Sequence, residues 1–237
     1  MRSGRLIKLQ RILLADFVPA GRRSADRSVG SENINMNQLL IATNNNGKIQ
    51  ELQSLLSDLN VELLTPSQIG LDIDIIEDGL TYAENATKKA VAFAQASGLI
   101  SIADDTGLEV DALDGAPGLY SKRYGSSENE GKELPDHERR RYLVRQLQDT
   151  PRPWTARFRA TIALAKDGDV QLSEGICEGE IIPEDRGANG FGYDPIFLFP
   201  ELGKTMAELS MDEKNRLSHR AKAVMKAKES LEVLFTG

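Results

Sequence analysis

The order of apolar segments over residues 37–64 constrains the fold of this chain more than any other feature. Residues 37–43 (NQLLIAT) form a short apolar run of the kind found in buried strands. Residues 47–60 then repeat isoleucine and leucine at helical spacing, and residues 61–64 (VELL) form a second apolar run before Pro66. A strand, a loop, a helix and a second strand in this order indicate an α/β fold.

The rest of the domain continues the alternation of helices and strands. Thr81, with Glu84 three residues later, predicts a helix N-terminus, and Gly98 predicts the end of the same helix. The turn KDGD at residues 166–169 predicts a hairpin. The remaining predicted elements are a buried strand over 99–103, a helix within 128–149 that starts near Asp136, two antiparallel strands within 155–181 and a helix over 212–235.

Composition limits the functions that are open to a chain of 237 residues. No segment approaches the roughly 20 apolar residues that span a bilayer, so no membrane partner is expected. The single cysteine, Cys177, excludes an intramolecular disulfide and a cysteine-based zinc site. Its surroundings favour an inert strand residue over a nucleophile. These features fit a reducing compartment, and we expect a cytoplasmic protein.

Residues 1–35 differ from the rest of the chain. They carry a net charge of +4, which leaves −11 for the remainder of a chain whose formal charge is −7. A body this acidic is unsuited to binding nucleic acid nonspecifically. The leader is rich in arginine and serine, as transit peptides are, but its three acids are unusual for one. We favour a disordered extension or a segment upstream of the true start at Met36, with the folded domain over 36–237.

The loop TNNNGK at residues 43–48 lies between a predicted strand and a predicted helix. Backbone N–H groups at a helix N-terminus, a glycine that permits close approach and a lysine charge together suit a phosphate group. The loop is not a Walker A motif, because Ala42 stands where that pattern needs glycine and Ile49 where it needs serine or threonine. A polar turn that begins a helix is an equally good interpretation of the local pattern.

Two adjacent acids, Asp104 and Asp105, come directly after the buried strand, and Gly107 is expected to let the chain turn. Adjacent strand residues face opposite sides, so one carboxylate can face a ligand while the other faces the supporting structure. The carboxyl end of a strand in an α/β sheet is where ligands usually bind. An acid there suits a divalent ion with phosphates, or a general base, and Glu77 and Glu84 are further candidate ligands. Solvation of a turn is the alternative.

The segment RGANGFGYDPIF at residues 186–197 places three glycines around Phe191 and Tyr193. Small residues beside an aromatic ring leave room for a flat ligand, and nucleotide bases stack on such rings. The alternative is a tight bend in a sheet. No dinucleotide-binding fingerprint is present, because no helix follows the glycines.

The segment EKNRLSHR at residues 213–220 is the densest group of hydrogen-bond donors in the last third of the chain. Lys214 and His219 can line the same cleft only if the chain bends near Ser218. A solvated helix face is the alternative interpretation.

Each of these motifs is of moderate value alone, but their order and combination are specific. The sequence resembles the inosine/xanthosine triphosphate pyrophosphatase (ITPase-like) family over residues 38 to about 226. Thr106 stands where many bacterial members have serine, which keeps the hydroxyl, and the first 35 residues have no counterpart. The matching stretches are LLIATNNNGKIQEL, ENATKKA, ADDTGLEVDALDGAPGLYSKRYG, EGEI, RGANGFGYDPIF and KTMAELSMDEKNRLSHRAKAV.

The resemblance implies an α/β fold with a long mixed sheet, flanking helices and two lobes around a nucleotide-binding cleft, in a homodimer. It implies Mg²⁺-dependent hydrolysis of ITP, dITP and XTP to the monophosphate and pyrophosphate. Asp105 would be the catalytic acid, as metal ligand or proton acceptor, with Glu77 as a second metal ligand and Asp104 supporting the metal site. The implied substrate-binding residues are Thr43, Asn44, Asn45, Asn46, Gly47, Lys48, Thr106, Phe191, Gly192, Tyr193, Asp194, Lys214, His219 and Arg220.

The chemistry of the bases predicts where selectivity arises. Hypoxanthine and xanthine carry an acceptor oxygen at position 6, which the donors Lys214, His219 and Arg220 can bind, whereas adenine carries a donor amine there. Phe191 is expected to stack on any purine. GTP carries the same oxygen, so its rejection requires that its 2-amino group be excluded by shape or by an unpaired acceptor.

Three other functions stay open on the sequence alone. A pyrophosphatase acting on modified pyrimidine or methylated nucleotides would use the same parts, and a substrate panel separates it. A nucleotide-binding module without hydrolysis is disfavoured by the paired acids. An RNA-binding protein is suggested only by the basic leader, and deleting the leader tests it.

Overall fold

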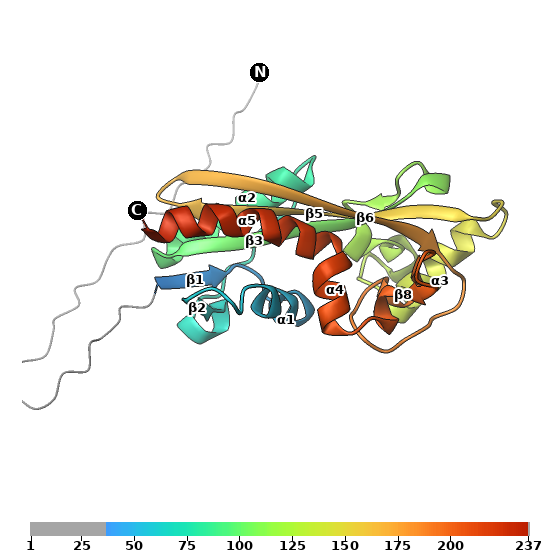
Figure 1. The fold of residues 1–237 in the computed structure, drawn as a ribbon. Helices are drawn as coiled ribbons and strands as arrows, with labels where there is room; N and C mark the ends of the chain where they lie inside the picture. Colours follow the sequence, from blue (N-terminus) through green and yellow to red (C-terminus); the bar gives the residue numbers. More distant parts are fainter. Residues whose placement is uncertain (1–36, 237) are drawn as a thin grey trace, which may run out of the picture. The chain divides into compact units, whose positions relative to one another are not determined.

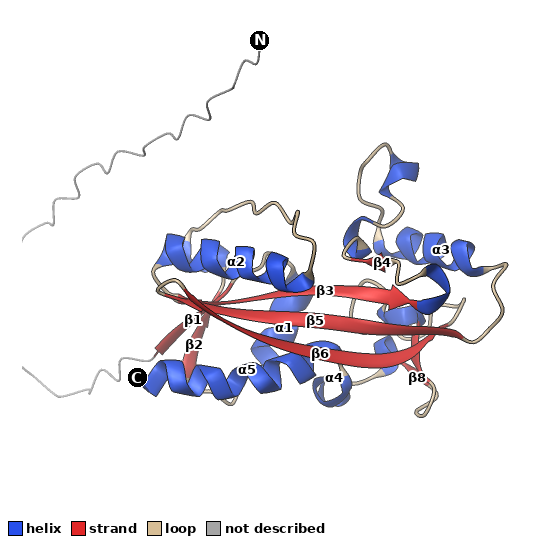
Figure 2. Cartoon of the chain, turned by 90° about the horizontal axis from the view of Figure 1, so that it is seen from above, coloured by secondary structure: helices blue, strands red, loops and turns tan. Residues whose placement is uncertain are grey.

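The computed structural model describes residues 37–236, and the prediction made for residues 1–35 lies outside them. One sheet runs through the described residues in the order β2-β1-β3-β5-β6-β7-β8, with β4 paired to β3 (Figures 1 and 2). The strands are β1 Asn37–Ile41, β2 Val61–Leu64, β3 Ile100–Val110, β4 Pro117–Gly118, β5 Trp154–Lys166, β6 Asp169–Ile181, β7 Phe197–Phe199 and β8 Lys204–Thr205. The α-helices are α1 Asn46–Leu55, α2 Tyr82–Ser97, α3 Asp136–Leu147, α4 Met211–Leu217 and α5 His219–Thr236. Short 3-10 helices lie at Pro66–Ile69, Asp111–Leu113, Ser121–Arg123, Ser126–Asn129, Asp194–Ile196 and Met206–Glu208.

The sheet is mixed. Strand β1 pairs in parallel with both β2 and β3, whereas β5 pairs in antiparallel fashion with β3 on one side and β6 on the other. Strands β5 and β6 each contain 13 residues and form the longest ladder. The expected long mixed sheet with flanking helices is therefore confirmed.

Helices cover both faces of the sheet at its β1 end (Figure 2). Because side chains alternate along a strand, Leu39 and Ile41 of β1 pack toward α1 and α5, while Leu40 packs toward α2. Ala86 and Ala90 of α2 are fully buried in this second core, and their small side chains bring the helix close to the sheet.

A separate core lies at the other end of the long strands. Leu143 and Leu147 of α3 pack there with Trp154 and Phe158 of β5 and with Leu108 of β3. The described residues therefore have one core on each face of the sheet at the β1 end and a third core at the other end of β5. The acids that follow Ala103 lie on β3 between them.

Several local signals predict their elements correctly. The Thr81 hydroxyl accepts a hydrogen bond from the backbone N–H of Glu84 at 3.1 Å, and Gly98 ends α2 in the left-handed region with φ of 71°. At the hairpin between β5 and β6, Asp167 and Gly168 both have positive φ, as a two-residue type I′ turn requires. Helix α3 begins at Asp136, as predicted.

The predicted end of the strand before the acid pair is wrong. Strand β3 continues to Val110, because β5 pairs with it from Ser101 to Val110 and supplies ladder partners for the acids as well. Gly107 lies inside the strand and does not turn the chain. A Cβ there would clash with the Gly118 carbonyl and the Tyr82 hydroxyl, so the glycine permits close packing instead.

The single helix predicted over 212–235 is two helices. The backbone of Ser218 is extended, with φ of −69° and ψ of 156°, and it separates α4 from α5. The Ser218 hydroxyl accepts a hydrogen bond from the backbone N–H of Ala221 at 3.1 Å, so it caps the new helix. This is the bend that the joint placement of Lys214 and His219 requires.

Candidate functional site

The loop after β1 leads into the N-terminus of α1. The side chain of Asn45 caps the helix by accepting from the backbone N–H of Lys48 at 3.2 Å, and the backbone N–H of Asn45 donates to the Thr43 hydroxyl. Asn44 and Asn46 are exposed. The loop therefore presents a helix N-terminus, the part of a helix best suited to an anion.

The two acids of β3 face opposite sides of the sheet. Asp104 continues the side of Ile102, which faces α1 and α5, and Asp105 continues the side of Ala103, which faces α2. Both carboxylates are buried, at 1% and 7% exposure. The division between two sides that the sequence predicts is confirmed by this placement.

Asp104 is held by cations from two helices. Its carboxylate lies 2.7 Å from Lys48 Nζ of α1 and 2.9 Å from Arg220 Nε of α5, and it accepts from the Thr106 hydroxyl at 2.6 Å. Burial alone would raise the pKa of Asp104, but Arg220, Lys48 and Lys89 outweigh it and hold this pKa far below its usual value. Asp104 therefore stays ionised and fixes the cations around it.

Asp105 contacts a different cation. Its Oδ1 lies 3.0 Å from Lys89 Nζ of α2, and its Oδ2 accepts from Asn85 Nδ2 at 3.3 Å. Burial raises the pKa of Asp105 despite the offsetting charges of Lys89 and Lys48. A buried carboxylate with a raised pKa is better suited to accept a proton than an ordinary surface acid is.

Lys89 joins the two predicted metal ligands. Its ammonium lies 2.7 Å from Glu77 Oε1, 3.0 Å from Asp105 Oδ1 and 2.7 Å from the backbone oxygen of Asp104. Glu84, the other candidate acid, is exposed and accepts from the backbone N–H of Leu80 at the start of α2. The structure therefore links Glu77, and not Glu84, to Asp105 through Lys89.

The carboxylates near Asp105 are too few to bind a divalent metal ion alone, but they can bind one together with a substrate. No group of three or more His, Cys, Asp or Glu side chains within residues 37–236 is arranged to hold a metal ion. Mg²⁺ is commonly bound by one or two carboxylates, with phosphate oxygens and water completing its shell. Asp105 and Glu77 fit such a site, in which a phosphate chain supplies the remaining ligands.

Glu51 of α1 is a central residue that the sequence analysis does not single out. Its buried carboxylate contacts Lys214 Nζ at 2.6 Å and also the Arg220 guanidinium. Burial would raise the pKa of Glu51, but Arg220 and Lys214 lower it below its usual value. Lys214 also lies 2.7 Å from Asp194 Oδ2. The donors of the C-terminal segment are thus held in place by carboxylates.

Phe191 lies against the loop that begins α1. A Cβ at Gly47 would clash with its ring, so the segment 186–197 is in contact with the loop of residues 43–48. Lys214 Nζ lies 5.5 Å and Arg220 Cζ 5.8 Å from the ring centroid. The backbone N–H of Phe191 donates to Asp194 Oδ2 at 2.9 Å, which fixes the ring relative to Lys214.

The neighbours of Phe191 have different surroundings. The backbone N–H of Gly192 donates to Asp136 Oδ2 at 2.7 Å, at the start of α3. Tyr193 is buried in the core formed with α3 and Trp154, and its hydroxyl donates to the backbone oxygen of Ser121 at 2.9 Å. The structure therefore gives Tyr193 a packing role and does not bring its hydroxyl to the acid pair.

His219, the first residue of α5, is 3% exposed and stacks on Phe158 with ring centroids 4.7 Å apart. Its Nδ1 lies 3.7 Å from Cys177 Sγ, and its Nε2 is buried without a hydrogen-bond partner among residues 37–236. Burial, reinforced by the Arg220 charge, lowers the pKa of His219 well below its usual value, so the ring is neutral at neutral pH.

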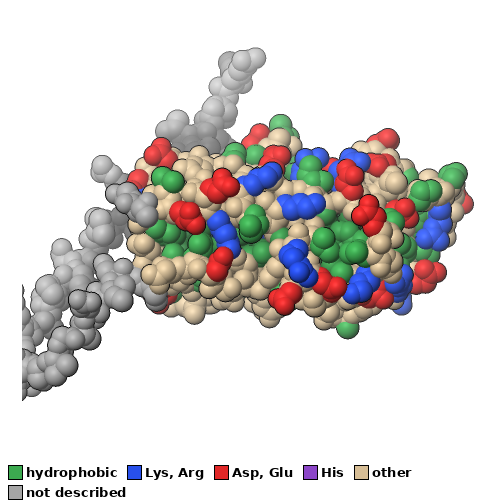
Figure 3. Space-filling view, in the orientation of Figure 1, with side chains coloured by type: hydrophobic (Ala, Val, Ile, Leu, Met, Phe, Trp, Pro, Cys, Tyr) green, Lys and Arg blue, Asp and Glu red, His purple; other side chains and the backbone are tan. Residues whose placement is uncertain are grey.

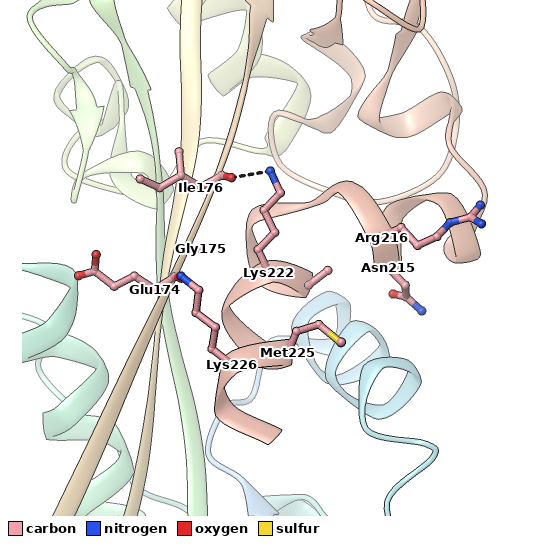
Figure 4. A pocket seen from close by; sticks show the side chains of 9 residues that line it. Glu174, Gly175, Ile176, Asn215, Arg216, Lys222, Met225 and Lys226 are labelled. Atoms are coloured by element: carbon pink, nitrogen blue, oxygen red, sulfur yellow. Dashed lines mark hydrogen bonds between the residues drawn. The ribbon is translucent and has the colours of Figure 1, made fainter. Parts of the chain in front are cut away.

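A groove on the described surface lies elsewhere. It has a volume of about 690 Å³ and lies between β6 and the α4–α5 region, with none of the predicted site residues in its wall (Figure 4). Lys222 and Lys226 donate to the backbone oxygens of Ile176 at 2.9 Å and Glu174 at 2.7 Å. They cover a part of the β6 edge that β7 does not pair.

The outer surface shows no single-sign area on the face seen in Figure 3, where acidic and basic side chains are interspersed. No helix among residues 37–236 has both the length and the apolar composition to cross a membrane.

Most of the predicted site residues come together. Lys48, Asp104, Thr106 and Arg220 form one connected network, and Lys89 links Asp104 to Asp105. Sequence reasoning missed Lys89 and Asn85 of α2 and Glu51 of α1 as named residues. The signal that could have found the first two is their spacing of four, which places both on one helix face beside a strand with two acids.

Comparison with known proteins agrees with this arrangement. The sequence model of the Ham1 family matches residues 39–230. A protein from Desulforamulus reducens named dITP/XTP pyrophosphatase is 44% identical over 200 residues, which cover 84% of this chain and 97% of the relative. A protein of the same name from Mannheimia succiniciproducens is 45% identical over 199 residues, with coverage of 82% and 98%.

Solved structures give the same result. A HAM1 protein from Coxiella burnetii superimposes with a TM-score of 0.73 at 39% identity and covers 83% of this chain and 99% of its own. The Ham1 protein from Staphylococcus aureus gives a TM-score of 0.71 at 38% identity, with coverage of 83% and 98%.

Proposed function

The chain belongs to the Ham1 family, and from that premise we propose that it hydrolyses the noncanonical purine nucleoside triphosphates ITP, dITP and XTP to the monophosphate and pyrophosphate. The observation that supports the proposal most strongly is that the two adjacent acids, Asp104 and Asp105, have different surroundings. Asp104 is neutralised by Lys48 and Arg220, whereas Asp105 is buried beside Lys89 with a raised pKa. Strand β3 thus supplies one carboxylate that binds cations, Asp104, and one that is suited to accept a proton, Asp105.

The triphosphate is proposed to lie on the loop of residues 43–48. The first N–H groups of α1, apart from that of Lys48, which donates to Asn45, are proposed to bind phosphate oxygens, and Gly47 allows the backbone to approach them. Lys48 and Lys89 lie on either side of the acid pair and can offset charge that develops on the departing pyrophosphate.

The reaction is hydrolysis of the bond between the α- and β-phosphates. A water molecule attacks the α-phosphorus, the bond to the bridging oxygen breaks, and pyrophosphate leaves with the electron pair of that bond. Asp105 is the group proposed to accept the proton of the water, and Asn85 and Lys89 orient its carboxylate.

Mg²⁺ is the proposed cofactor, with Asp105 and Glu77 as the residues that would hold it. When bound, it would neutralise phosphate charge and polarise the phosphorus–oxygen bonds. Removal of divalent ions with a chelator is expected to abolish pyrophosphate release, and added Mg²⁺ is expected to restore it. Full activity after chelation would contradict the proposal that the reaction requires Mg²⁺.

Base recognition is proposed to involve Phe191 and the C-terminal donors. Lys214 and Arg220 already contact carboxylates in the described structure, whereas His219 Nε2 has no partner among the described residues. His219 is therefore the donor best placed to take a new acceptor. The oxygen at position 6 of hypoxanthine or xanthine is such an acceptor, and the amine of adenine is not.

We also propose a cytoplasmic homodimer, as the family resemblance implies. Ile76 and Leu80, in the segment before α2, are 75% and 85% exposed and offer apolar surface for a contact between copies. Light scattering on the purified chain tests this, and a monomer at micromolar concentration would contradict it.

The experiment that tests the function is pyrophosphate release measured over a nucleotide panel. ITP, dITP and XTP are expected to be turned over far faster than ATP and GTP. Faster turnover of modified pyrimidine or methylated nucleotides would assign a different substrate class to the same site. Binding of ITP without pyrophosphate release would reduce the protein to a nucleotide-binding module.

A further inference from the structure

Cys177 of β6 and His219 of α5 form a buried pair that joins two elements. The sulfur lies 3.7 Å from Nδ1 of the imidazole, within hydrogen-bonding distance for sulfur, and Cys177 is 2% exposed. The two residues are 42 positions apart in the sequence. This contact is the observation from which the inference starts.

The two nitrogens of the imidazole have unequal surroundings. Stacking on Phe158 at an interplanar angle of 13° fixes the plane of the ring. Nδ1 then has the thiol as its partner, while Nε2 is buried with no partner among residues 37–236. A buried polar atom without a partner is costly, which favours a role for Nε2 toward a bound molecule.

The proton on this pair has a preferred position. Burial raises the pKa of the Cys177 thiol to about 12, although the backbone amides of His219 and Phe158 partly offset this. The thiol therefore keeps its proton at neutral pH, and His219 Nδ1, 3.7 Å from the sulfur, is the partner that the structure gives it. A thiol can donate to Nδ1 only when that nitrogen is bare, and in a neutral imidazole the ring proton is then on Nε2.

We propose that Cys177 is a positioning residue that sets the tautomer of His219. Its S–H group donates to Nδ1, which places the ring proton on Nε2 and makes Nε2 a donor. Such a donor can bind the acceptor oxygen at position 6 of hypoxanthine or xanthine and is mismatched with the amine of adenine. The link to base selectivity rests on the proposed function, whereas the tautomer itself does not.

The composition of the chain makes the tautomer directly measurable. The protein has two histidines, His137 and His219, and one cysteine. Long-range ¹⁵N–¹H correlation spectra of the ¹⁵N-labelled protein are expected to show His219 as the neutral tautomer protonated at Nε2. The exposed His137 is identified by its loss in a His137→Gln variant. A His219 ring protonated at Nδ1 would overturn the proposal, whatever the protein hydrolyses.

The Cys177 thiol allows a second measurement of the hydrogen bond to His219 Nδ1. Because Cys177 is the only cysteine, the S–H stretching band of the Raman spectrum belongs to it alone. The band is expected at the low frequency of a hydrogen-bonded thiol in the wild type and at a higher frequency in His219→Leu. The same frequency in both proteins would show that no S–H bond to Nδ1 exists.

The functional consequence is tested with Cys177→Val, which keeps an apolar side chain of similar size, and Cys177→Ser, which keeps a donor. The valine variant is expected to raise the KM for ITP by roughly fivefold, the effect of losing one neutral hydrogen bond, and to narrow the ratio of ITP to ATP turnover. The serine variant is expected to narrow the ratio of ITP to ATP turnover less than the valine variant does. An unchanged ratio in folded Cys177→Val would overturn the positioning role. Absence of pyrophosphate release from ITP in the wild type would instead contradict the proposed function and leave the tautomer measurement valid.

Discussion

Asp104 and Asp105 are chemically identical neighbours that the fold gives opposite properties. Asp104 lies between Lys48 and Arg220, whose charges hold its pKa far below the usual value. Asp105 faces α2 with Lys89 as its nearest cation, and burial raises its pKa. The difference follows from strand geometry, since adjacent residues must face different layers. It predicts that the two acids respond differently to the same substitution.

Asp104→Asn is expected to destabilise the protein. The asparagine would leave Lys48 and Arg220 without their shared countercharge in a buried site, which costs on the order of 3 kcal/mol of unfolding free energy. Urea denaturation at neutral pH measures this. The exposed Asp72→Asn serves as the control and is expected to have little effect. A stability of Asp104→Asn equal to that of the control would show that the pairing contributes nothing net.

His219 predicts a pH dependence of stability. Its pKa in the folded protein lies well below the ordinary 6.5, so below pH 6.5 the unfolded chain binds a proton that the folded chain does not. Its contribution is therefore complete above pH 6.5 and falls with decreasing pH, at up to about 1.4 kcal/mol per pH unit. Denaturation curves at several pH values are expected to show that the unfolding free energy of His219→Gln decreases less steeply with falling pH than that of the wild type. Parallel curves would mean that the imidazole becomes protonated in the folded state as readily as in the unfolded one.

At the scale of elements, the start of α1 and the aromatic segment meet at one contact. Gly47→Ala adds a Cβ that would clash with the Phe191 ring, so the ring must move from its place beside Lys214. We expect a lower kcat/KM for ITP by roughly tenfold, the effect of about 1.4 kcal/mol of lost binding. The exposed Gln50→Ala on the same helix is the control. If Gly47→Ala behaves like Gln50→Ala, the contact has no part in nucleotide binding.

The elements show which predictions from sequence succeed and why. The caps at Thr81 and Gly98 and the turn at Gly168 depend on residues close in the sequence, and they were predicted correctly. The length of β3 depends on β5, which starts at Trp154, far from the acid pair in sequence. No local pattern reports a pairing partner that far away, so the end of β3 was predicted wrongly.

At the scale of the whole molecule, the site is assembled from distant segments. Arg220 lies 116 residues from Asp104 and 169 from Glu51, yet it contacts both carboxylates. Motif reasoning pointed to Arg220 and Asp104 because each belongs to a recognisable stretch. It could not predict that Glu51, a charged residue within a helix of apolar spacing, would be buried as their partner. Burial of a charge is decided by tertiary packing, which a single sequence does not display.

Deletion of residues 1–35 is expected to leave turnover of ITP unchanged. The described domain begins with β1 at Asn37, and all of the predicted site residues follow it. Comparison of kcat and KM for the full chain and the shortened chain measures the effect. A large loss of activity in a shortened chain that remains folded would assign the leader a role in the site or in assembly.

The most direct test of the account is the turnover of ITP by Asp105→Asn, measured as pyrophosphate release in the presence of Mg²⁺. The substitution keeps the size of the side chain but removes the charge beside Lys89 and the capacity to accept a proton. The rate of pyrophosphate release is expected to fall by roughly a hundredfold or more, with the cooperative unfolding transition retained. Turnover equal to that of the wild type in the folded variant would contradict the assignment of Asp105 and, with it, the proposed mechanism.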